Sequence, residues 1–245
     1  HGYIVQFRID GRMHEFCRMQ QHVAGIIMKQ IKLMANVSLA DPFHPSESRL
    51  ELPVSITDHE IRVTTAPVAS GEAIAMRIID GRNLNLPLTD IGLSMQSLQC
   101  VNHMVHECSG LILIAGPTGA GKTTTAYSIL KSLFNQQQKI ISIEDPVELV
   151  VPFMRQMNVD QKHGFTMRSA LATVLRMDPD AVFIGEIRDA EAARIAFQAA
   201  ACGKRTVSTI HLRDVAATVT ALREFDIDGK TVVESIAGVI AQLLV

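Results

Sequence analysis

The stretch Gly116-Pro117-Thr118-Gly119-Ala120-Gly121-Lys122-Thr123 decides the fold of the chain, because it matches the pattern G-x-x-x-x-G-K-[ST]. The apolar run Leu111–Ala115 precedes it, and a run with helical periodicity at 122–134 follows. Glycine allows the tight turn through which several backbone N–H groups and a helix N-terminus point at one anion. The stretch therefore predicts a phosphate-binding loop between a strand and a helix.

The loop predicts a ligand as well as a fold. In loops of this kind the lysine reaches the β- and γ-phosphates, and the hydroxyl of the next residue binds magnesium. We therefore expect ATP and Mg²⁺ as ligands, with residues 116–123 and Thr124 around the phosphates. Lys122 is then a catalytic cation and Thr123 a metal ligand.

Short apolar runs alternate with longer helical runs from Ser109 onward. We predict strands at 111–115, 140–143, 181–184 and 205–209, and helices at 122–134, 167–176, 190–202, 215–225 and 231–244. This alternation is typical of a parallel sheet covered by helices on both faces, and together with the loop it predicts a nucleotide-binding α/β core. The last helix runs apolar to the end of the chain without a cap, so we expect the sequence to be truncated there.

The first 80 residues follow a different pattern. We predict strands at 3–9, 61–68 and 73–79 and one helix at 23–34, which together favour a small α+β domain. Residues 81–94 are rich in Asn, Pro, Thr, Asp and Gly, and this composition predicts a flexible hinge. The expected boundaries are 1–82 for the N-terminal domain, 83–96 for the linker and 97–245 for the ATPase domain.

Composition excludes several classes of protein. With 47% hydrophobic and 20% charged residues, the chain is not of the disordered type, and its longest apolar runs are far too short to span a bilayer. The net charge of −2, with no Trp and two Tyr, gives no basic or aromatic surface for nucleic acid. The four cysteines form no C-x-x-C pair, and we expect reduced, buried thiols.

Acidic residues and one histidine follow three further strands, at the edge where parallel sheets bind their ligands. Glu186 follows the run at 181–184, and we predict that it binds the metal ion or orients the attacking water. Glu144 and Glu148 follow the run at 140–143, and either carboxylate is a candidate for polarising that water. His211 follows the run at 205–209, where we expect it to sense the γ-phosphate. The residues alone leave open which acid is the base.

Four motifs in order resemble those of the secretion ATPase superfamily, in particular the assembly ATPases of type II secretion systems and type IV pili. They are the phosphate loop, the aspartate box at 143–148, the atypical Walker B motif at 185–189 and the histidine box at 208–211. Phe7-Arg8-Ile9-Asp10-Gly11 in the N-terminal domain extends the similarity over nearly the whole chain.

The resemblance implies a RecA-like core that follows a smaller, PAS-like α+β domain. It also implies a homohexameric ring whose N-terminal domains supply arginines to the nucleotide. Arg62 and Arg77 match those arginines by position, and a guanidinium near a transferring phosphoryl group neutralises developing charge. The resemblance also implies a cytoplasmic location peripheral to the inner membrane, and an inner-membrane platform protein as partner.

Other functions remain open from the sequence. A nucleic-acid-translocating RecA-like ATPase and a type IV secretion ATPase share the same type of core. A small-molecule kinase and a nucleotide-gated scaffold without turnover also share the phosphate loop. We therefore expect a motor that couples Mg-ATP hydrolysis to movement between the two domains, with these as its alternatives.

Overall fold

The chain divides into two units. The computed structural model describes residues 2–9, 11–39, 44–50, 59–80, 86–134 and 137–244. The units are His1–Gly81 and Arg82–Val245. Residues 81–85 of the predicted hinge lie outside the described residues, and the predicted domain boundaries at 82 and 97 stay predictions.

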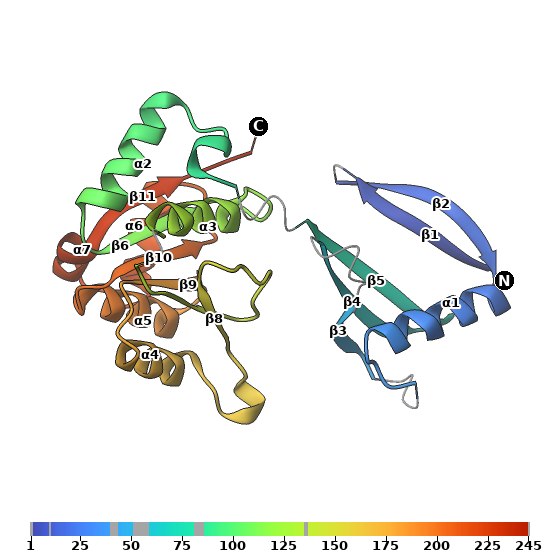
Figure 1. The fold of residues 1–245 in the computed structure, drawn as a ribbon. Helices are drawn as coiled ribbons and strands as arrows, with labels where there is room; N and C mark the ends of the chain where they lie inside the picture. The colour runs from blue at the N-terminus through green and yellow to red at the C-terminus, as the bar shows by residue number, and fades with distance from the viewer. Residues whose placement is uncertain are drawn as a thin grey trace. The chain divides into compact units, whose positions relative to one another are not determined.

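A six-stranded sheet forms the centre of the second unit. Its strands lie in the order β11-β6-β10-β9-β7-β8, and every neighbouring pair is parallel (Figure 1). The strands are β6 (Leu111–Ala115), β7 (Ile140–Glu144), β8 (Arg155–Asn158), β9 (Ala181–Ile187), β10 (Arg205–Ile210) and β11 (Ile236–Ala241). All the strands run the same way, so their carboxyl ends meet at one edge of the sheet.

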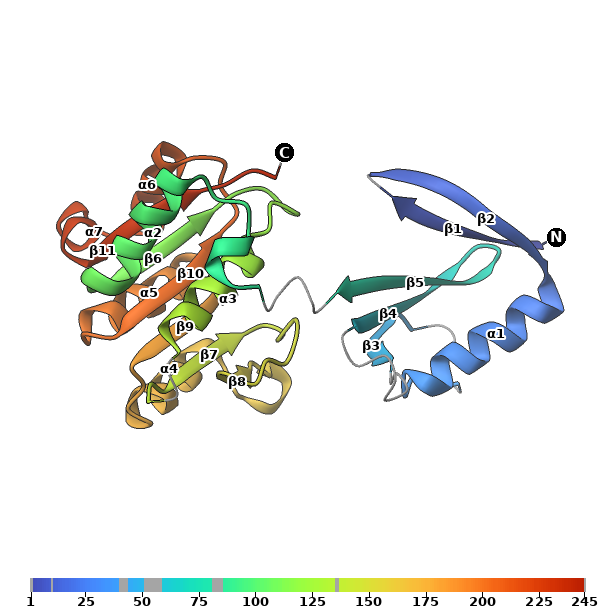
Figure 2. The same ribbon diagram turned by 45° about the horizontal axis from the view of Figure 1, so that its top comes forward.

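Helices cover this sheet. They are α2 (Met95–Glu107), α3 (Lys122–Leu133), α4 (Met167–Arg176), α5 (Ala190–Ala201), α6 (Val215–Glu224) and α7 (Gly229–Ser235). Helices α3 and α5 each contact β6, β9 and β10 (Figure 2). Strands β6 and β7 are buried along their whole length, as expected of a sheet that is covered on both faces. The predicted α/β core with a parallel sheet is confirmed.

The end of the chain differs from the prediction. We expected one helix over 231–244, but α7 ends at Ser235 and the next six residues form β11. The run Ile236-Ala237-Gly238-Val239-Ile240 is apolar and rich in β-branched residues, so it suits a strand that pairs with β6. Periodicity alone does not separate such a run from a buried helix, which is why the prediction was wrong.

Helix α2 and strand β8 of the second unit were not predicted, and neither were β2 (Arg12–Gln20) and β3 (Ser46–Leu50) of the first. Helix α2 occupies a stretch to which the sequence analysis assigned no element, and Ser94, the last residue of the predicted hinge, caps it through its hydroxyl. Strand β8 has only four residues and lies at the edge of the sheet, where hydrophobic patterning is weak. Among the described helices of the chain, none combines the length and the hydrophobicity needed to cross a bilayer.

The first unit contains a hairpin, a helix and a separate sheet. Strands β1 (Gly2–Ile9) and β2 (Arg12–Gln20) pair with each other, and α1 (Gln21–Met34) follows. Strands β3 (Ser46–Leu50), β4 (His59–Val68) and β5 (Gly71–Asp80) form an antiparallel sheet in that order. The buried Lys32 of α1 pairs with Glu72 of β5 at 2.5 Å, which ties the helix to the sheet. The predicted α+β composition of this unit is confirmed.

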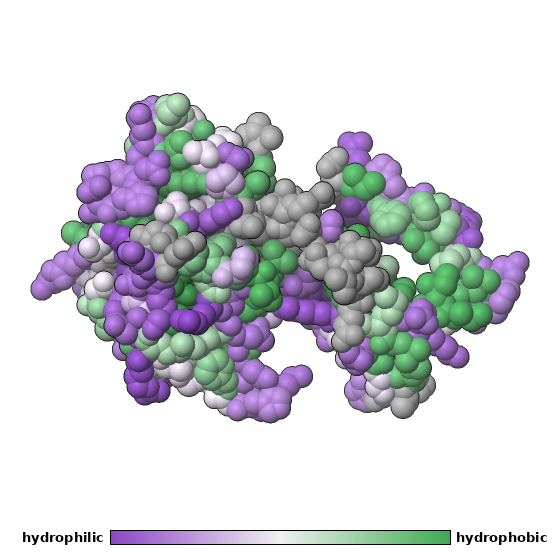
Figure 3. Space-filling view, in the orientation of Figure 1, coloured by the Kyte–Doolittle hydropathy of each residue, from purple (hydrophilic) through white to green (hydrophobic). Residues whose placement is uncertain are grey.

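Apolar side chains of the first unit remain in contact with solvent. Phe16 is 70% exposed, and Ile4, Phe7, Ile26 and Leu33 are exposed as well. Figure 3 shows hydrophobic residues over the hairpin and α1 on the face that it displays. Among the described residues of this unit, the buried apolar side chains are Ala24, Ala35 and Val63.

The exposure of the cysteines differs from the prediction that their thiols are buried. Cys100 and Cys202 are exposed, and Cys17 and Cys108 are half-buried, so the prediction of four buried thiols was wrong. Cys100 lies on the unpredicted helix α2, and Cys202 is the C-cap residue that directly follows α5. The position of Cys100 could not be assigned without α2, whereas Cys202 falls at the end of a helix that was predicted.

Candidate active site

The phosphate loop connects β6 to α3 at the carboxyl edge of the sheet. Gly116 lies where the chain leaves β6, and a Cβ atom there would come within 2.6 Å of the carbonyl oxygen of Gln242, which follows β11. Gly121 precedes α3 with φ of +80°, a left-handed conformation that side chains rarely adopt. Glycine is therefore required at both positions, for close approach at one and for conformation at the other.

Helix α3 begins differently from the other described α-helices of this unit. The residues before α2, α4, α5, α6 and α7 each accept a hydrogen bond from a first-turn N–H group; they are Ser94, Thr166, Asp189, Asp214 and Asp228. Gly121 has no side chain with which to do so. An anion is the natural partner for N–H groups at such a helix start, and the helix dipole favours its charge. The start of α3 is thus suited to phosphate.

Lys122 is folded back onto the loop that precedes it. Its Nζ donates to the carbonyl oxygens of Gly116 and Pro117, at 2.9 Å each, and the residue is 7% exposed. Burial lowers the pKa of Lys122, and the negative charge of Glu148 acts in the opposite direction. The ammonium group therefore lies in the loop that would hold phosphates, within range of the aspartate box.

Glu186 and His211 meet beside that lysine. His211 Nε2 lies 2.6 Å from Glu186 Oε1, and His211 Nδ1 lies 3.3 Å from Lys122 Nζ. Burial, and then the charge of Lys122, lower the pKa of His211. A neutral imidazole fits both contacts, because Nε2–H donates to the carboxylate and Nδ1 accepts from the ammonium. Thr118 Oγ1 is 3.5 Å from the same Nδ1. Three of the predicted motifs thus meet at one point.

Glu144 ends β7 inside the protein. It is 3% exposed, and three groups donate to its carboxylate: Tyr127 at 2.7 Å, Ser142 at 2.5 Å and Gln156 at 3.1 Å. Burial raises the pKa of Glu144, although the three donors oppose that shift. The Tyr127 hydroxyl is itself buried, which raises its pKa. Both carboxylate oxygens of Glu144 are therefore occupied by the protein.

Glu148 differs from Glu144 in its surroundings. It lies on the segment between β7 and β8, and it is half-buried. Its charge acts on Lys122, Tyr127 and Glu144. The aspartate box therefore places one carboxylate in a closed network and the other within range of the phosphate-loop lysine.

The oxygen ligands at this edge fit a magnesium–nucleotide complex. Thr123 is the second residue of α3, and Glu186 lies near the end of β9, where its side chain is 15% exposed. Hydroxyl and carboxylate oxygens are the hard ligands that Mg²⁺ takes in proteins, usually together with substrate phosphates. With the uncapped start of α3 beside them, these residues suit Mg²⁺ and a phosphate chain together.

The two predicted arginines lie in the first unit, opposite each other in the pairing of β4 with β5. Arg62 is largely buried and donates through Nε to Glu60, at 3.1 Å. Glu60 also pairs with Arg49 at 3.1 Å. Arg77 is exposed and forms no ion pair with any residue that the structure describes. Arg62 thus has a carboxylate partner, whereas Arg77 has none among the described residues.

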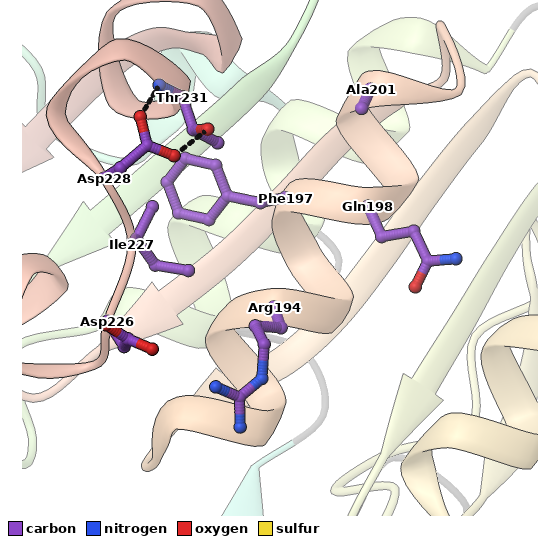
Figure 4. A pocket seen from close by; sticks show the side chains of 8 residues that line it. All are labelled: Arg194, Phe197, Gln198, Ala201, Asp226, Ile227, Asp228 and Thr231. Atoms are coloured by element: carbon purple, nitrogen blue, oxygen red, sulfur yellow. Dashed lines mark hydrogen bonds between the residues drawn. The ribbon is translucent and has the colours of Figure 1, made fainter.

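A pocket of about 260 Å³ opens elsewhere on the second unit. Figure 4 shows it between α5, which contributes Arg194 and Phe197, and the segment from Asp226 to the start of α7. Asp228 is engaged by Thr231, whose hydroxyl and N–H both donate to it. None of the predicted site residues lines this pocket.

The family model described as "Type II/IV secretion system protein" matches residues 1–245. The chain belongs to this family. Type II secretion system protein E of Pseudomonas aeruginosa is 36% identical over 242 residues, which cover 99% of the chain and 48% of that protein. Its counterpart in Pectobacterium carotovorum is 35% identical over 242 residues, covering 99% and 49%. The chain therefore spans about half the length of these relatives of the family.

Solved structures of related proteins share the fold. The ATPase DotB of Yersinia pseudotuberculosis superposes with a TM-score of 0.73 at 26% identity, over 98% of the chain and 68% of DotB. The pilus retraction motor PilT with bound ADP superposes with a TM-score of 0.67 at 24% identity, over 89% and 63%. These neighbours are consistent with the RecA-like core predicted for this member of the family.

Sequence reasoning missed the residues around Glu144. Tyr127 follows Lys122 by five positions on α3, and Gln156 lies on β8, which was not predicted. A polar residue at every second position, Gln156 and then Asn158, was the available signal. It indicates a strand face that carries amides, but only the fold shows what those amides contact.

Proposed function

We propose that the chain binds Mg-ATP and hydrolyses it as the motor of a type II secretion or type IV pilus machine. The observation that carries the proposal is the contact series from Lys122 through His211 to Glu186, at the uncapped start of α3. Membership of the secretion family supports it, as do relatives named Type II secretion system protein E and a neighbour described as an ATPase.

The loop and α3 bind the phosphates in this proposal. Lys122 exchanges the carbonyl oxygens of Gly116 and Pro117 for oxygens of the β- and γ-phosphates, so its charge meets the charge that develops in the transition state. His211 lies against Lys122 Nζ, where it contacts the γ-phosphate side of the site. Thr123 and Glu186 would hold Mg²⁺, which would supply charge neutralisation at the phosphate oxygens.

We assign the role of general base to Glu148. A base must accept a proton from water, and both oxygens of Glu144 already accept hydrogen bonds from Tyr127, Ser142 and Gln156. Glu148 is half-buried and acts electrostatically on Lys122. Its carboxylate is therefore the better candidate for orienting water and taking its proton.

The first unit contributes arginines to a homohexameric ring in this proposal. Arg77 presents an exposed guanidinium, whereas Arg62 must leave Glu60 to contact a phosphate. Closure of the two units over the nucleotide then couples occupancy to movement. The ring works in the cytoplasm against an inner-membrane platform protein, without binding nucleic acid.

Phosphate release from ATP without any added acceptor tests the activity. We expect turnover that EDTA abolishes and that Lys122→Ala lowers by at least about 100-fold, because the variant loses the phosphate-binding cation. Lys162→Ala, which removes an exposed lysine of the same unit, is the matched control and is expected to leave turnover unchanged. Undiminished turnover in Lys122→Ala would contradict the site, and strong stimulation by DNA or RNA would favour a nucleic-acid motor.

Assembly is tested separately, by measuring turnover against protein concentration with light scattering on the same samples. Arginines donated between subunits make the specific activity rise as the ring forms. A monomer with full activity at every concentration would remove the ring from the proposal.

A further inference from the structure

Two amide side chains of β8 hold the segment that carries Glu148. Asn158 Oδ1 accepts from the N–H of Val147 at 2.8 Å. Gln156 Oε1 accepts from the N–H of Val151 at 2.8 Å, and its Nε2 donates to the carbonyl of Leu149, also at 2.8 Å. The backbone is therefore bound by side chains on both sides of Glu148.

Gln156 also contacts the buried network that begins on α3. Its Nε2 lies 3.1 Å from Tyr127 Oη and 3.1 Å from Glu144 Oε1. Tyr127 is fully buried, and it belongs to the helix that starts with Lys122. One side chain thus joins the Glu148 segment to the helix that begins at the phosphate loop.

The contacts of Gln156 require an amide. The carbonyl oxygen accepts one N–H, and the NH₂ group donates toward a backbone carbonyl, a hydroxyl and a carboxylate. A glutamate would lose the donors and place a second charge beside Glu144, and a methionine of similar length would lose every hydrogen bond. No apolar residue satisfies these groups.

We propose that Gln156 is a positioning residue for hydrolysis, which fixes the backbone around Glu148 and ties it to α3. This inference rests on the proposed function of Glu148 as the base. Gln156 touches no reacting atom and acts through the geometry of Glu148. Displacement of a catalytic group by about 1 Å is enough to lower a rate by about 100-fold.

The decisive variant is Gln156→Met, with Gln161→Met as its control, because Gln161 is an exposed glutamine of the same region. Amide hydrogen exchange is read first, since it needs no turnover. We expect faster exchange at Val151, which loses its acceptor, with a smaller change at Val147, which keeps Asn158. Unchanged exchange at Val151 would overturn the proposal whatever the activity of the protein.

Kinetics then separate positioning from folding. At a temperature where the variant is fully folded, we expect kcat to fall by about 10-fold or more, while the Kd of a fluorescent ATP analogue changes by less than about 2-fold. A kcat within about 2-fold of wild type would overturn the proposal. Wild-type protein without turnover would refute the proposed function instead, and the exchange result would still decide whether Gln156 holds the segment.

A double-mutant cycle tests the route through Glu148. If Gln156 acts through that carboxylate, Gln156→Met should cause no further loss of kcat in a Glu148→Gln background. Additive losses of kcat would show that Gln156 does not act through Glu148. Should Gln156→Met not fold, Gln156→Asn serves in its place, because it keeps an amide that is one methylene too short to reach both Val151 and the Tyr127 hydroxyl.

Discussion

Two aromatic pairs with similar geometry lie in opposite environments in the two units. Phe7 and Phe16 in the hairpin have ring centroids 5.3 Å apart in an edge-to-face arrangement, yet Phe16 is 70% exposed. Tyr127 and Phe183 in the second unit have centroids 5.6 Å apart in the same arrangement, and Phe183 is 1% exposed. The second unit thus holds its site with its own core, whereas the described part of the first unit buries little apolar surface.

The largest expected effect is on stability, and it tests this comparison directly. We expect Phe183→Ala to lower the free energy of unfolding of the second unit by about 3–5 kcal/mol, because it leaves a cavity beside Tyr127. Phe16→Ala should cost less than about 1 kcal/mol, since its ring is already largely hydrated. Denaturant unfolding measures both. Equal losses would contradict the exposure of Phe16 and would show that its ring is buried in solution.

The next prediction concerns the arginines that the first unit lends to the proposed reaction. Arg77→Ala should lower kcat by about 100-fold with little change in stability, because its guanidinium is exposed and has no partner to lose within the described structure. Arg62→Ala should lower kcat and also destabilise the first unit, since Glu60 loses one of its two arginines. Turnover and thermal unfolding are measured together. If both arginines are dispensable for turnover, the first unit takes no part in catalysis.

The two tyrosines of the chain offer a matched pair of smaller effects. Tyr127→Phe removes the hydroxyl that donates to the buried Glu144, and we expect a loss of about 1–3 kcal/mol. Tyr3→Phe in the hairpin should change the free energy of unfolding by less than about 0.5 kcal/mol, because its hydroxyl has no hydrogen-bond partner within the described residues. Chemical denaturation of the two variants at one pH makes the comparison. A neutral Tyr127→Phe would mean that water replaces the lost donor.

The smallest effect depends on pH. Burial raises the pKa of Glu144 above its ordinary value of 4.5, so the folded protein keeps this proton to higher pH than the unfolded chain does. Its stabilising contribution is complete below pH 4.5 and is lost as pH rises through the raised pKa. Glu144→Gln cannot titrate. The stability of wild type relative to this variant should therefore fall above pH 4.5, by at most about 1.4 kcal/mol per pH unit. A difference that stays flat between about pH 4 and pH 8 would contradict the shift.

The sequence was most informative where a residue motif and the hydrophobic pattern of the flanking segments indicated the same structure. The buried strands β6 and β7 appear as unbroken apolar runs, and the glycines of the phosphate loop stand where close approach and a left-handed turn require them. Glu144, Glu186 and His211 each lie at or beside the carboxyl end of a strand, so their place at one edge of the sheet follows from the parallel topology. These features are local, so the residue types report them directly.

The remaining features depend on contacts between distant segments. Nothing in the sequence distinguishes Glu144 from Glu148, because the donors that surround Glu144 come from α3, β7 and β8. Strand β8 has four residues, so its two alternating amides are too short a pattern to assign a strand, and β11 was assigned to a helix because an apolar run suits either structure. In each case tertiary packing decided what local pattern left open.

The position of β11 has a consequence for the order in which the protein is made. β6 leads into the phosphate loop, but one of its two neighbours is β11, and the carbonyl of Gln242 lies against Gly116. During translation the loop emerges long before the strand that completes its support. The nascent chain therefore lacks this support until β11 has been made and pairs with β6, so Gly116 acquires its contact with Gln242 only after more than a hundred further residues have been added.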